Sequence, residues 1–196
     1  LELQSIKLNN YDKEKDYYIS VNMYNCTSPM FEFMSEDEMT RCEINTYVHN
    51  KDDVKGTLIM DYSANLLSMD PDNIFKVASK SKFKTNNLGD RIFEANNKDI
   101  DFFLQYKYND KKDKRFIMSK DLIKYTDNIY YNNGIIDKLY YDSSLTCANT
   151  RIPNKIKNVT FRFRNMKLTN PVSIFYFEDD IKFVGALWNN LINYNE

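Results

Sequence analysis

The stretch Asp16-Tyr-Tyr-Ile-Ser-Val-Asn-Met-Tyr24 places an apolar side chain at every second position, with Tyr17, Ile19, Val21 and Met23 in one row. Successive side chains of a β-strand point to opposite faces, so this period of two predicts a strand with one buried face. The same alternation recurs at residues 100–108 and 157–164. Three such stretches, far apart in the chain, favour a mainly β protein.

Weaker strand patterns and turn signals fill the intervals between these stretches. Further strands are expected at residues 1–8, 43–49, 57–62, 90–95, 115–118, 172–178 and 181–188. Asn133-Gly134 suits a two-residue type I′ turn, because both positions tolerate a positive φ. It predicts a hairpin that pairs Tyr131 with Ile136. Glu178-Asp179-Asp180 is expected to turn one late strand into the next.

Both faces of the predicted strand at 172–177 are apolar. Val172, Ile174 and Tyr176 form one row, and Phe175 and Phe177 form the other. We expect a central strand that is covered on both sides.

Helix signals are few. Asp70-Pro71-Asp72 offers a cap, a first-turn proline and an acid near the positive end of the helix dipole, which predicts a helix over 71–80. Ser35 and Glu38 have the spacing of a capping box, so a short helix is expected over 36–42. Residues 186–194 fit a helix or a strand. The resulting prediction is a single-domain antiparallel β-sandwich over residues 1–196, with one or two short helices.

Composition excludes several classes of protein. The chain has 196 residues and a formal net charge of −1, from 27 basic and 28 acidic side chains, so it lacks the basic excess typical of nucleic-acid binders. The longest wholly apolar run, 183–188, is far below the roughly 20 residues of a membrane-spanning helix. With only 4 glycines, the chain has no phosphate-cradling glycine motif. The many Asn, Lys, Tyr and Ile residues suggest an AT-rich genome, parasitic or viral.

The compartment stays open, with a lean towards the secretory route or the cell surface. Because the chain begins with Leu1, we expect a processed product or an excised domain. Its three cysteines allow at most one internal disulfide, and Cys26 with Cys42 would close a short loop. Asn25 and Asn158 each begin a glycosylation sequon.

No catalytic or metal-binding constellation stands out. His49 is the only histidine, and a nucleophilic pair with Cys147 has no local signature to support it. Zinc is not expected without paired Cys or His spacing, and no cofactor is expected. The acidic run 36–38 is expected to complement a helix dipole, and 109–113 to be a solvated loop between strands. In Phe161-Arg-Phe-Arg164 the aromatic and basic side chains fall on opposite faces, which favours core phenylalanines over a base-stacking surface.

Three stretches resemble the strand order of synaptotagmin-type calcium- and lipid-binding sandwiches: residues 16–24, 103–110 and 115–118. The resemblance implies calcium ligands in the loops at Asp12, Asp16, Asp110 and Asp113. Met118 stands where that family has a small residue.

We therefore expect a non-catalytic protein-binding or structural module. The contact is expected on one face of the 129–138 hairpin, at Tyr130, Asn132, Ile135 and Asp137, where Tyr and Ile mix with Asn and Asp. The opposite face, with Ile129, Tyr131 and Ile136, would seal the core. The hairpin could instead merely close one end of the sandwich. The alternative function is a peripheral, calcium-dependent lipid-binding module, which would touch a membrane without spanning it.

Overall fold

The computed structural model describes residues 3–8, 16–26, 39–65, 80–109, 111–115, 129–132, 135–138, 150–178 and 181–189, and all regular structure in them is β-strand. The strands are β1 (Gln4–Ser5), β2 (Tyr18–Cys26), β3 (Met39–His49), β4 (Lys55–Ala64), β5 (Lys80–Thr85), β6 (Asp90–Asn96), β7 (Ile100–Lys107), β8 (Lys114–Arg115), β9 (Ile129–Asn132), β10 (Ile135–Lys138), β11 (Arg151–Ile152), β12 (Ile156–Phe163), β13 (Met166–Leu168), β14 (Ser173–Glu178) and β15 (Ile181–Asn189).

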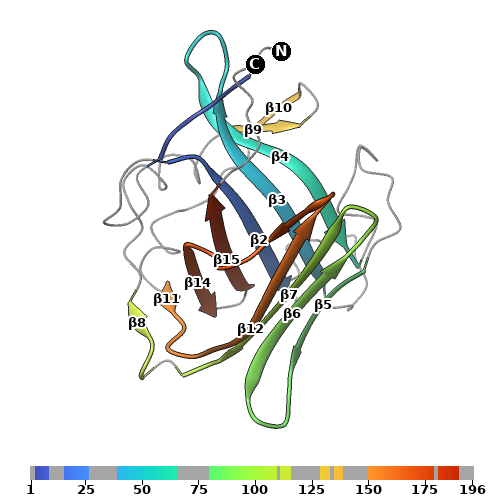
Figure 1. Cartoon of the computed structure of the whole chain (residues 1–196), viewed down its shortest axis with the longest axis vertical. Helices are drawn as coiled ribbons and strands as arrows, with labels where there is room; N and C mark the ends of the chain where they lie inside the picture. The colour runs from blue at the N-terminus through green and yellow to red at the C-terminus, as the bar shows by residue number, and fades with distance from the viewer. Residues whose placement is uncertain are drawn as a thin grey trace.

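The strands form two sheets that pack face to face, as the sequence predicted (Figure 1). The large sheet has the order β10-β9-β4-β3-β2-β15-β14-β11-β8, and β1 pairs with the end of β3. The small sheet has the order β13-β12-β7-β6-β5. The pairs are antiparallel except for β4 and β9, which run parallel.

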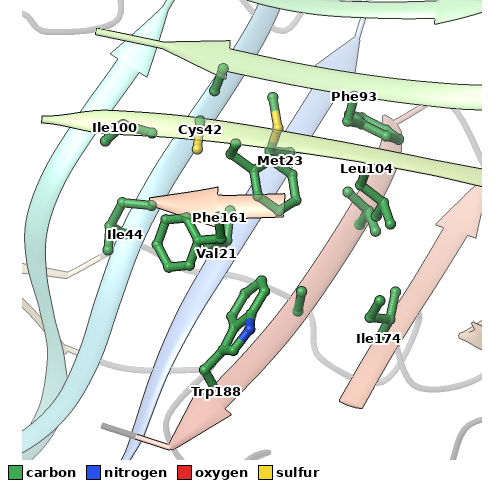
Figure 2. Close-up of a cluster of buried hydrophobic side chains, with 14 of the residues drawn as sticks. Val21, Met23, Cys42, Ile44, Phe93, Ile100, Leu104, Phe161, Ile174 and Trp188 are labelled. Carbon is green, nitrogen blue, oxygen red and sulfur yellow. The ribbon is translucent and has the colours of Figure 1, made fainter. Parts of the chain in front are cut away.

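The main core lies between the sheets. Val21, Met23 and Ile44 of the large sheet meet Phe93 and Leu104 of the small sheet (Figure 2). Trp188 of β15 crosses the interface and packs on Phe161, with ring centroids 4.8 Å apart.

The alternation predicted the inward rows correctly. Ile19, Val21 and Met23 are buried in the main core. On β7 the four residues Ile100, Phe102, Leu104 and Tyr106 are buried, and on β12 Phe161 and Phe163 are. Arg162 lies outside the core, as the alternation predicts. The expected separation is wrong for Arg164, whose guanidinium lies 4.7 Å over the Phe163 ring, because Arg164 follows the last residue of β12 with a positive φ of 53° and leaves the alternation.

Strand β14 is buried on both faces, as predicted. Ile174 and Tyr176 join the main core, whereas Phe175 and Phe177 join a second cluster on the other face of the large sheet. Val172 packs against this second cluster and not beside Ile174, because it precedes the strand and leaves its alternation. The chain reverses direction between β14 and β15, as expected, because the two strands pair antiparallel up to Glu178 opposite Lys182. Residues 179–180 of the expected turn lie outside the described part.

The predicted hairpin is present with the predicted register. Strands β9 and β10 pair Asn132 with Ile135, Tyr131 with Ile136 and Tyr130 with Asp137.

The helix expected over 36–42 is wrong from Met39 onward. That residue begins β3, which pairs with both β2 and β4. Pairing on two sides, in a stretch rich in β-branched residues, outweighs a local capping signal. Residues 71–79 of the other expected helix lie outside the described part, and Lys80 already begins β5. The ambiguous C-terminal stretch is strand up to Asn189.

Candidate interaction surface

A bidentate ion pair closes one end of the sandwich. Arg91 lies on β6 of the small sheet, and Glu178 ends β14 of the large sheet. Nε and Nη2 of Arg91 donate to the two carboxylate oxygens of Glu178 over 2.6 and 2.7 Å. The side chains are only 18% and 9% exposed. Their hydrogen bonds raise the pKa of Arg91, and the planar fork fixes the position of one sheet against the other.

A buried carboxylate ties the connecting segments to the same end. Oδ2 of Asp113 accepts a 2.6 Å hydrogen bond from the hydroxyl of Tyr176. The carboxylate also accepts from the backbone N–H groups of Asn109 and Asn154. The expectation of a solvated loop is wrong for Asp113, which is buried, although Lys111 and Lys112 beside it are exposed. Asp113 thus anchors the loop after β7 and the segment before β12 to the large sheet.

Three tyrosines fill the space between these two anchors. The rings of Tyr106 and Tyr108 pack on that of Tyr176, with centroids 5.0 and 5.8 Å away. The guanidinium of Arg91 lies over the Tyr108 ring at 4.8 Å. Burial raises the pKa of Tyr106 and of Tyr176. These phenols therefore stay protonated near neutral pH, where they hydrogen-bond and pack.

A second carboxylate, Asp90, holds the small sheet together on its outer side. Its Oδ2 accepts from Lys157 Nζ at 2.6 Å, from Gln105 Nε2 at 2.8 Å and from Asn86 Nδ2 at 2.9 Å. Led by the bond from Lys157, these interactions lower the pKa of Asp90 to about 2. Lys157 is the extra residue of a bulge in β12, where the register to β7 shifts. A bulge re-aims a side chain, here towards Asp90.

The same asparagine shapes the turn between β5 and β6. Oδ1 of Asn86 accepts from the backbone N–H groups of Leu88 and Asp90, both at 2.9 Å. Gly89 takes a positive φ of 76° to close the turn. The turn is thus held by its own hydrogen bonds, and it projects beyond the rest of the sandwich (Figure 1). Leu88 lies at its tip and is 72% exposed.

A second exposed aliphatic side chain lies at the same end of the small sheet. Ile156, at the start of β12, is 38% exposed. Ile156 pairs with Tyr106 of β7, and Tyr106 pairs on its other side with Arg91 of β6. Arg91 follows Leu88 by only three residues in the chain. In the part of the chain that the structure describes, Leu88 and Ile156 are the only exposed large hydrophobic residues.

Basic residues are concentrated in the two stretches of the chain that follow β7 and precede β12. Residues 107–115 and 151–157 contain eight cations, and the carboxylate described among them, Asp113, is buried and already bonded. Lys157 pairs with Asp90, and within the described ranges the other seven have no ion-pair partner: Lys107, Lys111, Lys112, Lys114, Arg115, Arg151 and Lys155. We call Leu88, Ile156 and these seven residues the basic end.

Two arginines of the basic end face each other directly. Arg115 on β8 lies opposite Arg151 on β11. Directly opposed residues have Cβ atoms about 5 Å apart and share a face, and like charges in that position repel. No carboxylate in the described residues bonds to either arginine, so the pair is an uncompensated concentration of positive charge.

The residues predicted from the sequence as the contact lie elsewhere. Tyr130, Asn132, Ile135 and Asp137 lie on β9 and β10, at the end of the sandwich away from the β5–β6 turn (Figure 1). Their side chains lie outside the described part, so the assignment of these four residues to one exposed contact face of the hairpin remains a prediction.

The two sequons differ in accessibility. Asn25 is 1% exposed, and its side-chain amide donates to the Thr40 hydroxyl at 3.0 Å. A glycan on that nitrogen would have to break this packing. Asn158 and Thr160 are exposed on β12, so only the second sequon is accessible in the folded domain.

Among the described residues, the thiol of Cys42 and the imidazole of His49 do not come together in a site. Cys42 is a free, fully buried thiol in the main core, opposite Met23, so a bridge from Cys42 to Cys26 is wrong. Burial raises the pKa of Cys42 well above its usual value. His49 lies at the end of β3, where its Nδ1 is 2.9 Å from the carbonyl oxygen of Asn50. Cys147 and the acidic run 36–38 lie outside the described residues.

The carboxylates implied by the synaptotagmin resemblance are only partly described. Asp16 accepts from the side-chain amide of Asn189 at 3.0 Å, and Asp113 is bonded as described above. Asp12 and Asp110 lie outside the described part. Among the described residues, no three His, Cys, Asp or Glu side chains form a group suited to a metal ion.

Comparison with known proteins adds no family. No protein-family model, curated protein or solved structure gives a match to this chain. Within the described residues, no helix is long and apolar enough to cross a membrane.

Proposed function

We propose that this chain is a non-catalytic binding module and that the basic end is its contact surface for an anionic partner. One observation carries the proposal. The only exposed large hydrophobics in the described part lie at the same end as seven cations without an ion-pair partner. Burial of an exposed apolar side chain and neutralisation of uncompensated charge both favour association with a complementary partner.

The framework beneath this surface supports a binding role. The ion pair of Arg91 with Glu178 and the bond of Tyr176 to Asp113 hold both sheets and the loops between them at this end. Fixed side chains lose little conformational entropy when a partner binds. The net charge of −1 also means that the positive potential is local, which would orient the domain towards its partner.

The β9–β10 hairpin is a second candidate contact, for a protein partner. Its confirmed register places Tyr130 opposite Asp137 and Asn132 opposite Ile135. Tyr130→Ala would then weaken binding of the isolated partner by at least about 1 kcal/mol. Stability should change by no more than about 0.5 kcal/mol, as for a surface site.

Elution from a cation-exchange column at neutral pH tests whether the basic end is a localised anion-binding surface. The triple variant Lys111→Glu, Lys112→Glu, Lys155→Glu should elute at much lower salt than the unaltered chain. The matched control reverses the charge of three exposed lysines elsewhere, Lys51, Lys55 and Lys80, and changes the net charge equally. Equal loss of retention in both triple variants would contradict a localised anion-binding surface.

A further inference from the structure

We infer that the anionic partner of the basic end is the surface of a lipid bilayer that carries negatively charged headgroups. Leu88 would enter the boundary between headgroups and acyl chains, and the surrounding cations would lie at the headgroup level. This inference rests on the proposed function and names the partner class for the same surface.

The shape and position of the apolar residues favour a bilayer. Leu88 is 72% exposed at the tip of a turn that projects from the sandwich, and Ile156 lies at the same end. A protruding aliphatic side chain needs a receiving apolar medium. A bilayer offers one at every point of its surface, without a matching pocket. The hydrogen bonds of Asn86 hold the turn in place, so Leu88 is presented without a conformational change.

The arrangement of the cations also favours a bilayer. The five lysines and two arginines come from two stretches of the chain, 107–115 and 151–155, and are spread over the end of β7, the loop 111–113, the paired strands β8 and β11, and the segment before β12. Such a spread suits a plane of many headgroups. Each cation close to an anionic bilayer raises affinity by about fivefold, so a few of them suffice for stable binding. The opposed pair Arg115 and Arg151 has the planar donor groups that bind a phosphate oxygen in two-point fashion.

Single-stranded nucleic acid fits the same charges less well. Such binding uses aromatic faces for base stacking beside the cations. At this end Tyr106 and Tyr176 are buried against each other, and the ring of Tyr108 is occupied by Arg91. An aliphatic tip contributes nothing to stacking, whereas it contributes directly to insertion.

Vesicle flotation with the full chain tests the inference. Vesicles of phosphatidylcholine alone are compared with vesicles that contain about one-third phosphatidylserine, at low and high salt. We expect at least roughly tenfold stronger binding to the anionic vesicles, which high salt removes. Leu88→Ser should weaken that binding by about fivefold or more without lowering the melting temperature, because the side chain is exposed. The Lys111, Lys112, Lys155 triple variant should lose it, and the Lys51, Lys55, Lys80 control should keep it.

Three results would overturn the inference. The first is equal binding to both kinds of vesicle, and the second is unchanged vesicle binding by Leu88→Ser. The third is tighter binding to a single-stranded oligonucleotide or to polyglutamate than to anionic vesicles, with no effect of Leu88→Ser. In the third case the proposed anion-binding function would stand and the lipid assignment would fall. Loss of the difference between the two lysine triples in column retention would remove the proposed function as well.

Discussion

Arg91 and Glu178 form the one ion pair, among the described residues, that joins the small sheet to the large sheet. Arg91→Met should destabilise the domain by about 2 kcal/mol or more, because Glu178 is left partly buried and unpaired. The double variant Arg91→Met, Glu178→Leu should recover part of the loss. Urea unfolding measures both, and a single variant within about 0.5 kcal/mol of the unaltered chain would contradict this role.

The bond between Tyr176 and Asp113 should matter independently of ring packing. Tyr176→Phe keeps the contacts with Tyr106 and Tyr108 but removes a donor from a buried carboxylate. We expect a loss of about 1–3 kcal/mol in the free energy of unfolding. Tyr108→Phe, on a half-buried ring of the same cluster, is the matched comparison and should cost less. A larger loss at position 108 than at 176 would show that the bond to Asp113 is not the anchor.

Gly185 is required by the aromatic ring across from it. A Cβ atom at this position would lie 2.5 Å from Cζ of Phe175, its direct partner on β14. Gly185→Ala should therefore cost about 1–3 kcal/mol, as overpacking does. In a Phe175→Leu background the same change should cost clearly less, because the ring is gone. Equal costs in the two backgrounds, in a double-mutant cycle of unfolding free energies, would exclude this steric coupling.

Asp90 gives the stability a dependence on acid pH. Its pKa is about 2 in the folded chain, against an ordinary value of 3.8. A carboxylate with a lowered folded pKa stabilises fully above its unfolded pKa and loses that contribution as the pH falls through its folded pKa. The difference in melting temperature between the unaltered chain and Asp90→Asn should thus be constant near neutral pH and shrink between about pH 4 and pH 2.

Asp101→Asn is the control for this titration, since Asp101 is an exposed carboxylate on the neighbouring strand β7. It should alter the acid limb of the melting curve much less. An Asp90→Asn difference that stays constant down to pH 2 would mean that the hydrogen bonds from Lys157, Gln105 and Asn86 do not stabilise the charged form.

Much of the fold follows from local patterns. Alternation at Ile19, Val21 and Met23 predicted the inward row of a central strand, and Asn133-Gly134 predicted a hairpin register that is correct at Tyr131 and Ile136. Strand β5 escaped prediction because lysines occupy its outer positions and Ser81 one of its inward ones, so it lacks an apolar row. Its position at the edge of the small sheet explains that composition, since lysines protect edges from further pairing.

The candidate site was harder to predict than the fold. The basic runs 107–115 and 151–157 are visible in the sequence but are separated by about 40 residues. Only the pairing of β8 with β11 and of β7 with β12 brings them together. The formal net charge of −1 gives no sign of the basic end, because acidic residues elsewhere in the chain offset its positive charge. Asp113 appears polar and loop-like in sequence, and its burial depends on Tyr176, 63 positions away.

A fluorescent reporter at position 88 tests the central claim most directly. An environment-sensitive dye is attached to Leu88→Cys, in a chain whose Cys26 and Cys147 are serine, and anionic vesicles are added. We expect a blue shift and a rise in intensity at position 88, and no change for the same dye at Lys51→Cys. A dye at position 88 that stays in water, with the protein bound to the vesicles, would contradict insertion through the basic end.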